Sequence, residues 1–353
     1  MGKSTLFNAL AETSVACSNY PFCTVEPNVG VVPVPDPRLE RLGELLAPEK
    51  LTPASIRFVD IAGLVSGASR GEGLGNKFLA NIREVDALVH VVRCFDATSV
   101  AHVDGVPDPE RDLETIATEL LLADLETCER NLQKRRKDRD RGDKEAAPTV
   151  AALEKVAAAL DAGTAVRDAG LTRAELGLVS EYRFLSEKDL IVVANISETD
   201  VGGGEARWVE RLSEATGEPG WKIVPIAATL ESELVTLSES EREEFLAGWG
   251  LKEKGLSRLV KAGYKLLDLV TFFTIKGKET RAWTVTSGTS VAEAAGKIHS
   301  DMQSGFIRAE VVAFDDLVAE GSMQRVRETG HLRTEGKDYR VAEGDVILIH
   351  FHQ

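Results

Sequence analysis

Gly2-Lys3-Ser4-Thr5 leads directly into a helix-forming segment, residues 6–10. It looks like the second half of the phosphate-binding motif G-x-x-x-x-G-K-[ST]. In that motif, backbone N–H groups at a helix N-terminus surround the phosphates, the lysine reaches the β- and γ-phosphate oxygens, and the hydroxyl binds Mg²⁺. The motif therefore predicts nucleotide contacts for Gly2, Lys3, Ser4 and Thr5, with Ser4 also a ligand of Mg²⁺.

A second piece of the same chemistry is Asp60-Ile61-Ala62-Gly63, at the end of an apolar strand expected from Ile56. A carboxylate at a strand end can hold Mg²⁺ through water, and the glycine can offer its N–H to the γ-phosphate. We expect Asp60 in the first role and Gly63 in the second. Thr24, in the loop after the first helix, is placed to complete the Mg²⁺ shell; the alternative is an ordinary loop threonine.

The third piece is Asn195-Ile196-Ser197-Glu198, which follows the strand expected over residues 190–194. GTPases carry N-K-x-D at this point, and the aspartate accepts hydrogen bonds from two N–H groups of guanine. Both the lysine and the aspartate are replaced here, so a built-in preference for guanine is not expected. Ala227 and Ala228 follow a further strand and resemble the loop whose backbone amide meets the base.

Two residues are candidates for a part in hydrolysis. Leu64 occupies the position after D-x-x-G, where many GTPases have the glutamine that orients the attacking water. Hydrolysis then needs another group. His102, in the loop after the strand expected over residues 87–93, has suitable chemistry as a water-positioning group or weak base. The alternative for His102 is a polar loop histidine without a catalytic role.

Strand and helix patterns alternate in residues 1–107 and again in residues 187–268, which predicts an α/β domain with a parallel sheet. Apolar residues at three- and four-residue steps predict an antiparallel helical hairpin inserted at residues 108–186, with a break around Gly142 and Pro148. The strands expected in the α/β domain cover residues 56–60, 87–93, 190–195 and 222–226.

Residues 269–353 change to short alternating strands and predict a small α+β domain. One helix is expected among the strands, from Ser290 to Met302, and Ser290 with Glu293 forms an S-x-x-E capping box at its start. The strands expected here cover residues 272–276, 282–286, 309–313 and 346–351.

The hairpin tip, residues 134–144, carries seven basic and three acidic residues on a chain whose net charge is −15. A local positive charge can steer such a tip to rRNA; the alternative is a solvated helix end. The acidic balance of the whole chain argues against wrapping nucleic acid over the entire surface, and we expect no DNA partner.

The composition is that of a water-soluble globular protein of 353 residues. No apolar run approaches the roughly 18 residues that span a bilayer, and no basic segment followed by an apolar one opens the chain. We therefore expect a cytoplasmic protein without a membrane partner. The four cysteines are scattered, without metal-ligand spacing, and are expected to be reduced thiols.

Several longer motifs accompany the three nucleotide-binding pieces. They are N-Y-P-F-C-T (19–24), P-V-P-D-P-R-L (33–39), D-I-A-G-L-V (60–65), G-L-G-N-K-F-L (73–79), R-C-F (93–95), N-I-S-E (195–198), E-G-K-D-Y (335–339) and G-D-V (344–346). In this order, and over essentially the whole chain, they resemble the Obg-like ATPases of the YchF type.

The resemblance implies a P-loop NTPase G domain, interrupted by a helical hairpin and followed by a ubiquitin-like TGS domain. It implies ATP preferred over GTP because of the N-x-x-E variant, with Asn195 and the backbone around Ile196 meeting the adenine. It also implies Mg²⁺ held by Ser4 and Thr24, Leu64 in place of the catalytic glutamine, and His102 as the family's loop histidine. Members of the family associate with the ribosome and take part in translation and stress responses.

The start of the chain departs from the family pattern. Family members have an apolar strand and G-L-P-N-V before the G-K-S-T, whereas Met1 stands here in the Val position. We expect the true start to lie upstream. Without the first half of the loop, two or three charge-assisted hydrogen bonds would be lost, which would weaken nucleotide binding by about 3 to 9 kcal/mol.

The leading hypothesis is thus an Mg²⁺-dependent ATPase that acts on the ribosome, with the large subunit and its rRNA as the expected contact. A GTPase with a degenerate base site is one alternative. The other is a non-catalytic ribosome or RNA adapter whose incomplete phosphate loop stays empty. The sequence leaves the oligomeric state open.

Overall fold

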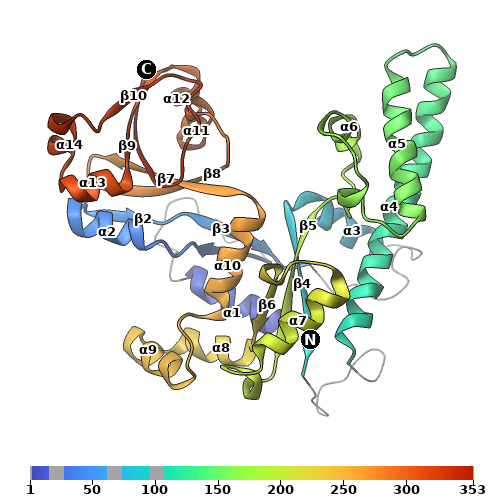
Figure 1. Ribbon diagram of the computed structural model, residues 1–353, viewed down its shortest axis with the longest axis horizontal. Coiled ribbons are helices and arrows are strands. Elements are labelled where there is room, and N and C mark those ends of the chain that lie inside the picture. The colour runs from blue at the N-terminus through green and yellow to red at the C-terminus, as the bar shows by residue number, and fades with distance from the viewer. Residues whose placement is uncertain (1, 16–27, 62–73, 96–106, 353) are drawn as a thin grey trace. The chain divides into compact units, whose positions relative to one another are not determined.

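A computed structural model describes residues 2–15, 28–61, 74–95 and 107–352 (Figure 1). Its internal contacts divide the chain into two compact units. The first comprises Met1–Leu6 and Val59–Gly255, and the second comprises Phe7–Phe58 and Leu256–Gln353. Helix α1 (Lys3–Val15) begins in the first unit and continues into the second.

The first unit is built on a parallel sheet in the order β4-β5-β6. Val89 pairs with Ile191, and Val193 pairs with Val224. The central strand β5 is buried from Ile191 onward, which explains why it appears in the sequence as a continuous apolar run. The strands are β4 (Ala87–Cys94), β5 (Asp189–Ile196) and β6 (Ile223–Ile226), and the helices near them are α3 (Leu74–Glu84), α7 (Glu205–Thr216), α8 (Ala228–Thr236) and α9 (Glu239–Gly248).

The predicted helical hairpin is present as α4 (Pro109–Asp140) and α5 (Ala146–Asp161). The Asp108 side chain accepts a hydrogen bond from the Arg111 N–H and caps α4. The predicted break is present between the end of α4 at Asp140 and the start of α5 at Ala146, and so includes Gly142. It ends before Pro148, because this proline lies in the first turn of α5, where a missing N–H costs no intrahelical bond.

The chain that returns from the hairpin contains short helices that the sequence analysis did not separate. They are η2 (Val166–Asp168), α6 (Arg173–Val179) and η3 (Ser180–Tyr182), followed later by η4 (Glu198–Asp200) and η5 (Gly220–Lys222). Thr172 and Glu175 form a capping box at the start of α6. Val179 joins Cys128, Leu153 and Val156 in the buried cluster of the hairpin.

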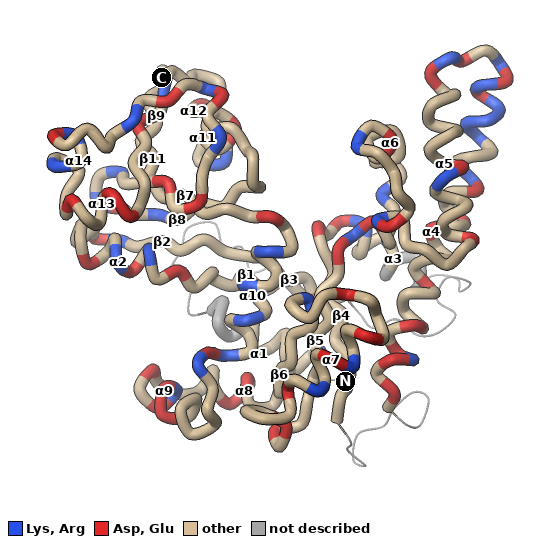
Figure 2. The backbone as a smooth tube through the Cα atoms, in the orientation of Figure 1, with Lys and Arg blue, Asp and Glu red and all other residues tan. Residues whose placement is uncertain are grey.

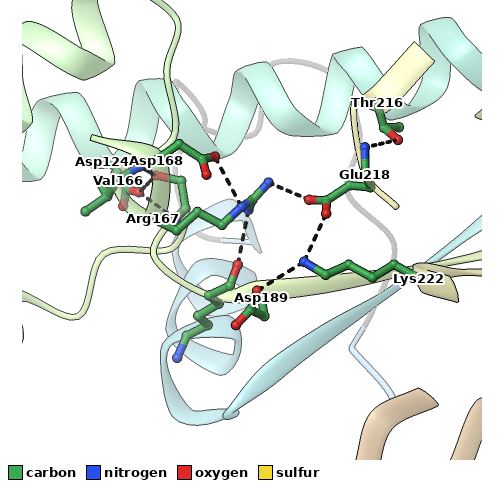
Figure 3. A network of polar contacts seen from close by, with 10 residues as sticks. Asp124, Val166, Arg167, Asp168, Asp189, Thr216, Glu218 and Lys222 are labelled. Atoms are coloured by element: carbon green, nitrogen blue, oxygen red, sulfur yellow. Dashed lines mark hydrogen bonds and ion pairs between the residues drawn. The ribbon is translucent and has the colours of Figure 1, made fainter. Parts of the chain in front are cut away.

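The base of the hairpin is fixed by a buried carboxylate. Asp124 on α4 is 0% exposed and accepts three hydrogen bonds, from the Leu185 N–H at 2.8 Å and from the Ser186 N–H and Oγ at 2.7 Å. Figure 3 shows a second polar group nearby, in which Glu218 bridges Arg167 at 3.2 Å and Lys222 at 2.9 Å. Together these contacts attach the hairpin to the edge where β5 begins.

Replacing Asp124 with alanine is expected to lower the free energy of unfolding by about 3 kcal/mol, because two buried N–H groups lose their acceptor. Thermal unfolding followed by circular dichroism measures the effect. Asp168→Ala is the matched control, since its carboxylate is 62% exposed and faces Arg167 at 3.4 Å. Equal melting temperatures for the two variants would contradict the structural role of Asp124.

The second unit contains a six-stranded sheet in the order β10-β9-β11-β7-β8-β2. Phe272, Val291, Ala309 and Ile347 belong to its core. The edge strand β2 comes from the N-terminal part of the chain and runs parallel to β8, with Thr52 Oγ1 donating to Glu279 Oε1 at 2.5 Å. The strands are β2 (Lys50–Thr52), β7 (Leu269–Lys276), β8 (Glu279–Thr286), β9 (Phe306–Ala313), β10 (Arg333–Glu335) and β11 (Asp345–Phe351).

The P-V-P-D-P-R-L motif packs against this sheet. Asp36 caps α2 (Pro37–Leu46), and the Arg38 guanidinium reaches Asp36, Glu343 and the face of the Phe273 ring. Two further strands, β1 (Val29–Pro33) and β3 (Ser55–Val59), pair with each other in the same region of the chain. Helix α10 (Gly255–Leu266) leads into β7. The motif therefore attaches the N-terminal segment to the C-terminal sheet.

The single helix expected from Ser290 to Met302 is two helices. α11 (Val291–Ile298) begins at the predicted capping box, but His299 is extended, with φ −163° and ψ 142°, and α12 (Ser300–Ser304) starts after it. The His299 Nδ1 accepts from the Asp301 N–H and so caps the second helix. The expectation of one helix in this domain is also wrong, since α13 (Phe314–Glu320) and α14 (Met323–Thr329) follow β9. Both are seven residues long, too short for a clear periodic pattern.

No helix in the described ranges combines the length and the apolar character needed to cross a membrane.

Candidate nucleotide-binding site

The first two predicted motifs meet at the start of α1. Gly2 has φ +87°, in the left-handed region, and α1 begins immediately after it. The Lys3 Nζ donates to Asp60 Oδ1, which places the lysine of the phosphate loop beside the carboxylate expected to serve Mg²⁺. The first turn of α1 contains no acidic residue, so the N–H groups and the dipole of this helix end face no competing anion within it.

Gly2 is also packed against the third motif. A Cβ at this position would lie 2.1 Å from the Asn195 Nδ2 and 3.5 Å from the Ala228 Cβ. Asn195 is 4% exposed, and its Oδ1 accepts from the Ala228 N–H at 3.1 Å. The structure thus brings Gly2, Asn195 and Ala228 together from three separate segments. Only a glycine fits at position 2, because the space that a side chain would need is filled by Asn195.

Of the other residues of N-I-S-E, Ile196 is buried in the core and Glu198 lies at the surface. Ile196 is 3% exposed and packs in the core of the β4-β5-β6 sheet, so its backbone is the part left for a ligand. Glu198 is exposed, and its Oε1 accepts from the Thr229 hydroxyl at 2.6 Å. Thr229 was not among the predicted site residues. Its position directly after Ala227 and Ala228 was the available signal.

A second residue that the sequence analysis missed supports the same loop. Glu231 on α8 is 4% exposed, and its Oε1 accepts from the Gly255 N–H at 2.6 Å. A Cβ at Gly255 would lie 2.8 Å from that oxygen. Because a buried carboxylate needs such a donor, this contact fixes α8, whose first residues Ala228 and Thr229 form part of the candidate site.

A cavity of about 560 Å³ opens beside Ser197 and Thr199. Two of its arginines are ion-paired, Arg207 with Asp200 at 2.6 Å and Arg211 with Glu110. Cys94 also lines it, and burial raises the pKa of this thiol to about 12, so the sulfur stays protonated at neutral pH. The cavity therefore offers no thiolate to a ligand. A ligand would reach Arg207 or Arg211 only by breaking the ion pair of that arginine.

The remaining predicted site residues fall in two groups. Ser4 and Thr5 lie in the first turn of α1, with Ser4 exposed. Thr24, Gly63, Leu64 and His102 lie outside the described residues, so their expected roles stay predictions.

The donor set suits Mg²⁺ that arrives with a nucleotide. In the described ranges, no group of three or more His, Cys, Asp and Glu side chains is placed to hold a metal ion by itself. Mg²⁺ is usually bound through one or two protein ligands together with water and substrate phosphates. Asp60 and the Ser4 hydroxyl near the α1 N-terminus fit that mode.

Comparison with known proteins identifies the family. Residues 1–127 match a family model described as "50S ribosome-binding GTPase", and residues 269–352 match the YchF-GTPase C-terminal model, described as a protein of unknown function. The ribosome-binding ATPase YchF of Haemophilus influenzae is 48% identical over 352 residues, which cover 100% of this chain and 96% of that protein. The chain belongs to the YchF family. YchF proteins of Escherichia coli O157:H7 and Bacillus subtilis are 46% and 45% identical, with the same coverage.

Solved structures agree with the assignment. The YchF GTPase of Schizosaccharomyces pombe is 33% identical, covers 99% of this chain and 95% of its own, and superimposes with a TM-score of 0.89. A GTP-binding protein of Pyrococcus horikoshii OT3 gives a TM-score of 0.58 at 19% identity, and so shares the fold alone. The predicted fold, a P-loop GTPase-type domain with a C-terminal domain, is confirmed.

Proposed function

We propose that this protein is a Mg²⁺-dependent ATPase that binds the ribosome, acts in translation and stress responses, and works in the cytoplasm. The observation that carries the proposal is the meeting of three motifs in one unit: Lys3 against Asp60, and Gly2 against Asn195 and the Ala228 N–H. Relatives of this chain carry the name ribosome-binding ATPase. We place its ribosomal contact on the large subunit and its rRNA.

The contact at Glu198 supports ATP over GTP. Guanine presents two N–H donors to the carboxylate of N-K-x-D, and both carboxylate oxygens accept. Here Thr229 already donates to Glu198 Oε1, which draws the carboxylate toward Thr229 and leaves it one fewer acceptor position for a base. Adenine has a single donor group on that edge, the 6-amino group. Asn195 is held by Ala228 and presents its amide beside Gly2, where it can contact the base.

The proposed roles follow from these positions. Lys3 leaves Asp60 to reach the β- and γ-phosphate oxygens, and the N–H groups at the α1 N-terminus receive the phosphates. Ser4, Thr24 and Asp60 would hold Mg²⁺, which neutralises charge that develops on the phosphate oxygens. Gly63 donates its N–H to the γ-phosphate. Leu64 cannot orient water, and His102 takes that part.

The domain boundaries remain as we proposed from the sequence: a G domain in residues 1–107 and 187–268, the hairpin in residues 108–186 and a TGS domain in residues 269–353. In this proposed division, the hairpin extends from the nucleotide domain.

The test is steady-state hydrolysis of ATP by the full-length protein, with and without ribosomes and Mg²⁺. We expect hydrolysis that needs Mg²⁺ and a fall of roughly 100-fold for His102→Ala, the lower end of the range for losing a positioned acid or base. His90→Ala is unsuitable as a control because this histidine lies in the sheet; His331→Ala, on the C-terminal domain, serves instead. ATP turnover unaffected by Mg²⁺ removal would rule the proposal out.

A further inference from the structure

The hairpin carries basic residues of two kinds, which the structure separates. Arg135 pairs with Glu181 at 2.6 Å, Arg136 pairs with Glu154 at 2.8 Å, and Arg139 lies 3.1 Å from Asp140. We call these three the paired arginines. Neighbouring carboxylates already balance their positive charge, so another anion would have to displace a carboxylate to bind them.

Four other basic residues form a stripe along α4. Arg130, Lys134, Lys137 and Arg141 are exposed, and within the described residues none of their side chains makes a hydrogen bond or an ion pair, although, after the hydrogen bond from Arg135, the charge of Lys134 helps to lower the pKa of Glu181. We call these four the basic stripe. Their spacings of four, three and four residues place them within an arc of about 60° on one side of the helix.

The stripe faces away from the hairpin core. Cys128 and Leu132, which are buried against α5, lie on the opposite side of α4, about 150° or more from the centre of the stripe. Between positions 130 and 141 the acidic side chains, Asp138 and Asp140, lie about 70° to 90° away on either side, and Glu126, one turn before Arg130, lies about 50° from the centre of the stripe. Figure 2 shows Lys and Arg, with Asp and Glu between them, along the hairpin toward its free end.

The geometry and composition of the stripe suit a linear polyanion. Four cations follow one another over about 16 Å of helix. From position 130 to position 141, every residue except the buried Leu132 is polar or charged. A protein interface of ordinary stability has an apolar or aromatic centre, which this face lacks. A phosphate backbone needs no such centre, because its binding is driven by charge and counterion release.

We propose that the basic stripe is the surface through which this protein contacts the phosphate backbone of a structured RNA. The net charge of −15 makes the rest of the molecule repel RNA, so the stripe also sets the orientation of approach. With the ribosome as partner, which rests on the proposed function, the RNA is rRNA.

The experiment measures binding to a fluorescein-labelled RNA duplex of about 20 base pairs by anisotropy, across salt from about 50 to about 200 mM. Four phosphate contacts predict a log–log slope near −3.6, or a loss of affinity of about 150-fold over that range. Lys134→Gln, Lys137→Gln and Arg141→Gln together should reduce the slope to about −0.9.

The matched control replaces the paired arginines, Arg135, Arg136 and Arg139, with glutamine. It changes the net charge by the same three units on the same helix, and its slope should stay near that of the unmodified protein. Melting curves establish that each variant is folded. Since Arg135 also contacts Tyr182, a second matched pair spares it: Lys137→Gln with Arg141→Gln, against Arg136→Gln with Arg139→Gln.

The salt slopes and the ribosome cosedimentation together show whether the basic stripe binds RNA. Equal loss of slope in stripe and control variants would show that only total charge matters, and would overturn it. Loss of ribosome cosedimentation in the stripe variant with unchanged duplex binding would assign the stripe to a ribosomal protein, which also overturns it. If the unmodified protein fails to sediment with ribosomes, the proposed function fails, while the duplex slopes still decide whether the stripe binds RNA.

Discussion

Replacing Lys3 with alanine is expected to weaken ATP binding by about 100-fold or more, the largest effect of any single substitution in the site. The lysine supplies charge-assisted hydrogen bonds to the β- and γ-phosphate oxygens, and losing two such bonds costs about 3 kcal/mol or more. The substitution also leaves the Asp60 carboxylate without the ammonium group that faces it in this structure, so a phosphate would approach an uncompensated negative charge. Titration of a fluorescent ATP analogue measures the dissociation constant.

A partner substitution separates the two roles in this ion pair. Asp60→Asn removes the carboxylate expected to serve Mg²⁺ but keeps the lysine, so it should abolish the Mg²⁺-dependent part of the affinity and leave the rest. Lys3→Ala should weaken binding both with Mg²⁺ and in its absence. If Lys3→Ala bound ATP with Mg²⁺ within threefold of the unmodified protein, the lysine would not contact the phosphates.

The meeting of Lys3 with Asp60 could be anticipated because the proposed chemistry depends on short motifs. Residue type and spacing predict roles for Gly2, Lys3 and Asp60, since phosphate binding requires a glycine with open backbone, a cation and a carboxylate at fixed places. The Gly2 to Asn195 contact adds a reason for the glycine that the motif alone does not give. For Thr229 the only signal was its position directly after Ala227 and Ala228, and this did not reveal its contact with Glu198, because a threonine that holds a carboxylate has no sequence pattern of its own.

Parts of the fold were beyond sequence patterns for similar reasons. The strand β2 has three residues, and its pairing with β8 joins segments more than 200 positions apart, so neither periodicity nor local turn residues reveal it. The interruption at His299 depends on one residue taking an extended conformation inside an otherwise helical pattern. By contrast, the capping box at Ser290 was predicted, because both of its contacts are local.

The second prediction concerns the choice of base. Glu198→Asp is expected to shift the ratio of ATP to GTP affinity toward GTP by about tenfold, the equivalent of one additional hydrogen bond of about 1.4 kcal/mol. The shorter side chain withdraws from Thr229 and offers both oxygens to the two N–H donors of guanine. Thr229→Val should act in the same direction, because it removes the hydroxyl that holds Glu198 Oε1 toward residue 229. Competition of ATP and GTP against a labelled nucleotide gives the ratio.

A lysine at position 196 is unsuitable as a test of base specificity. Restoring the lysine of N-K-x-D at Ile196 would place an ammonium group where the side chain is 3% exposed and packed in the core, so loss of folding would mask any change in specificity. Glu233→Asp, an exposed glutamate on α8, is the matched control and should leave the ratio unchanged. Both Glu198→Asp and Thr229→Val break the hydrogen bond between Thr229 and the carboxylate, one by shortening the acceptor and the other by removing the donor. If the ratio of ATP to GTP affinity is unchanged in both variants, other residues select the base.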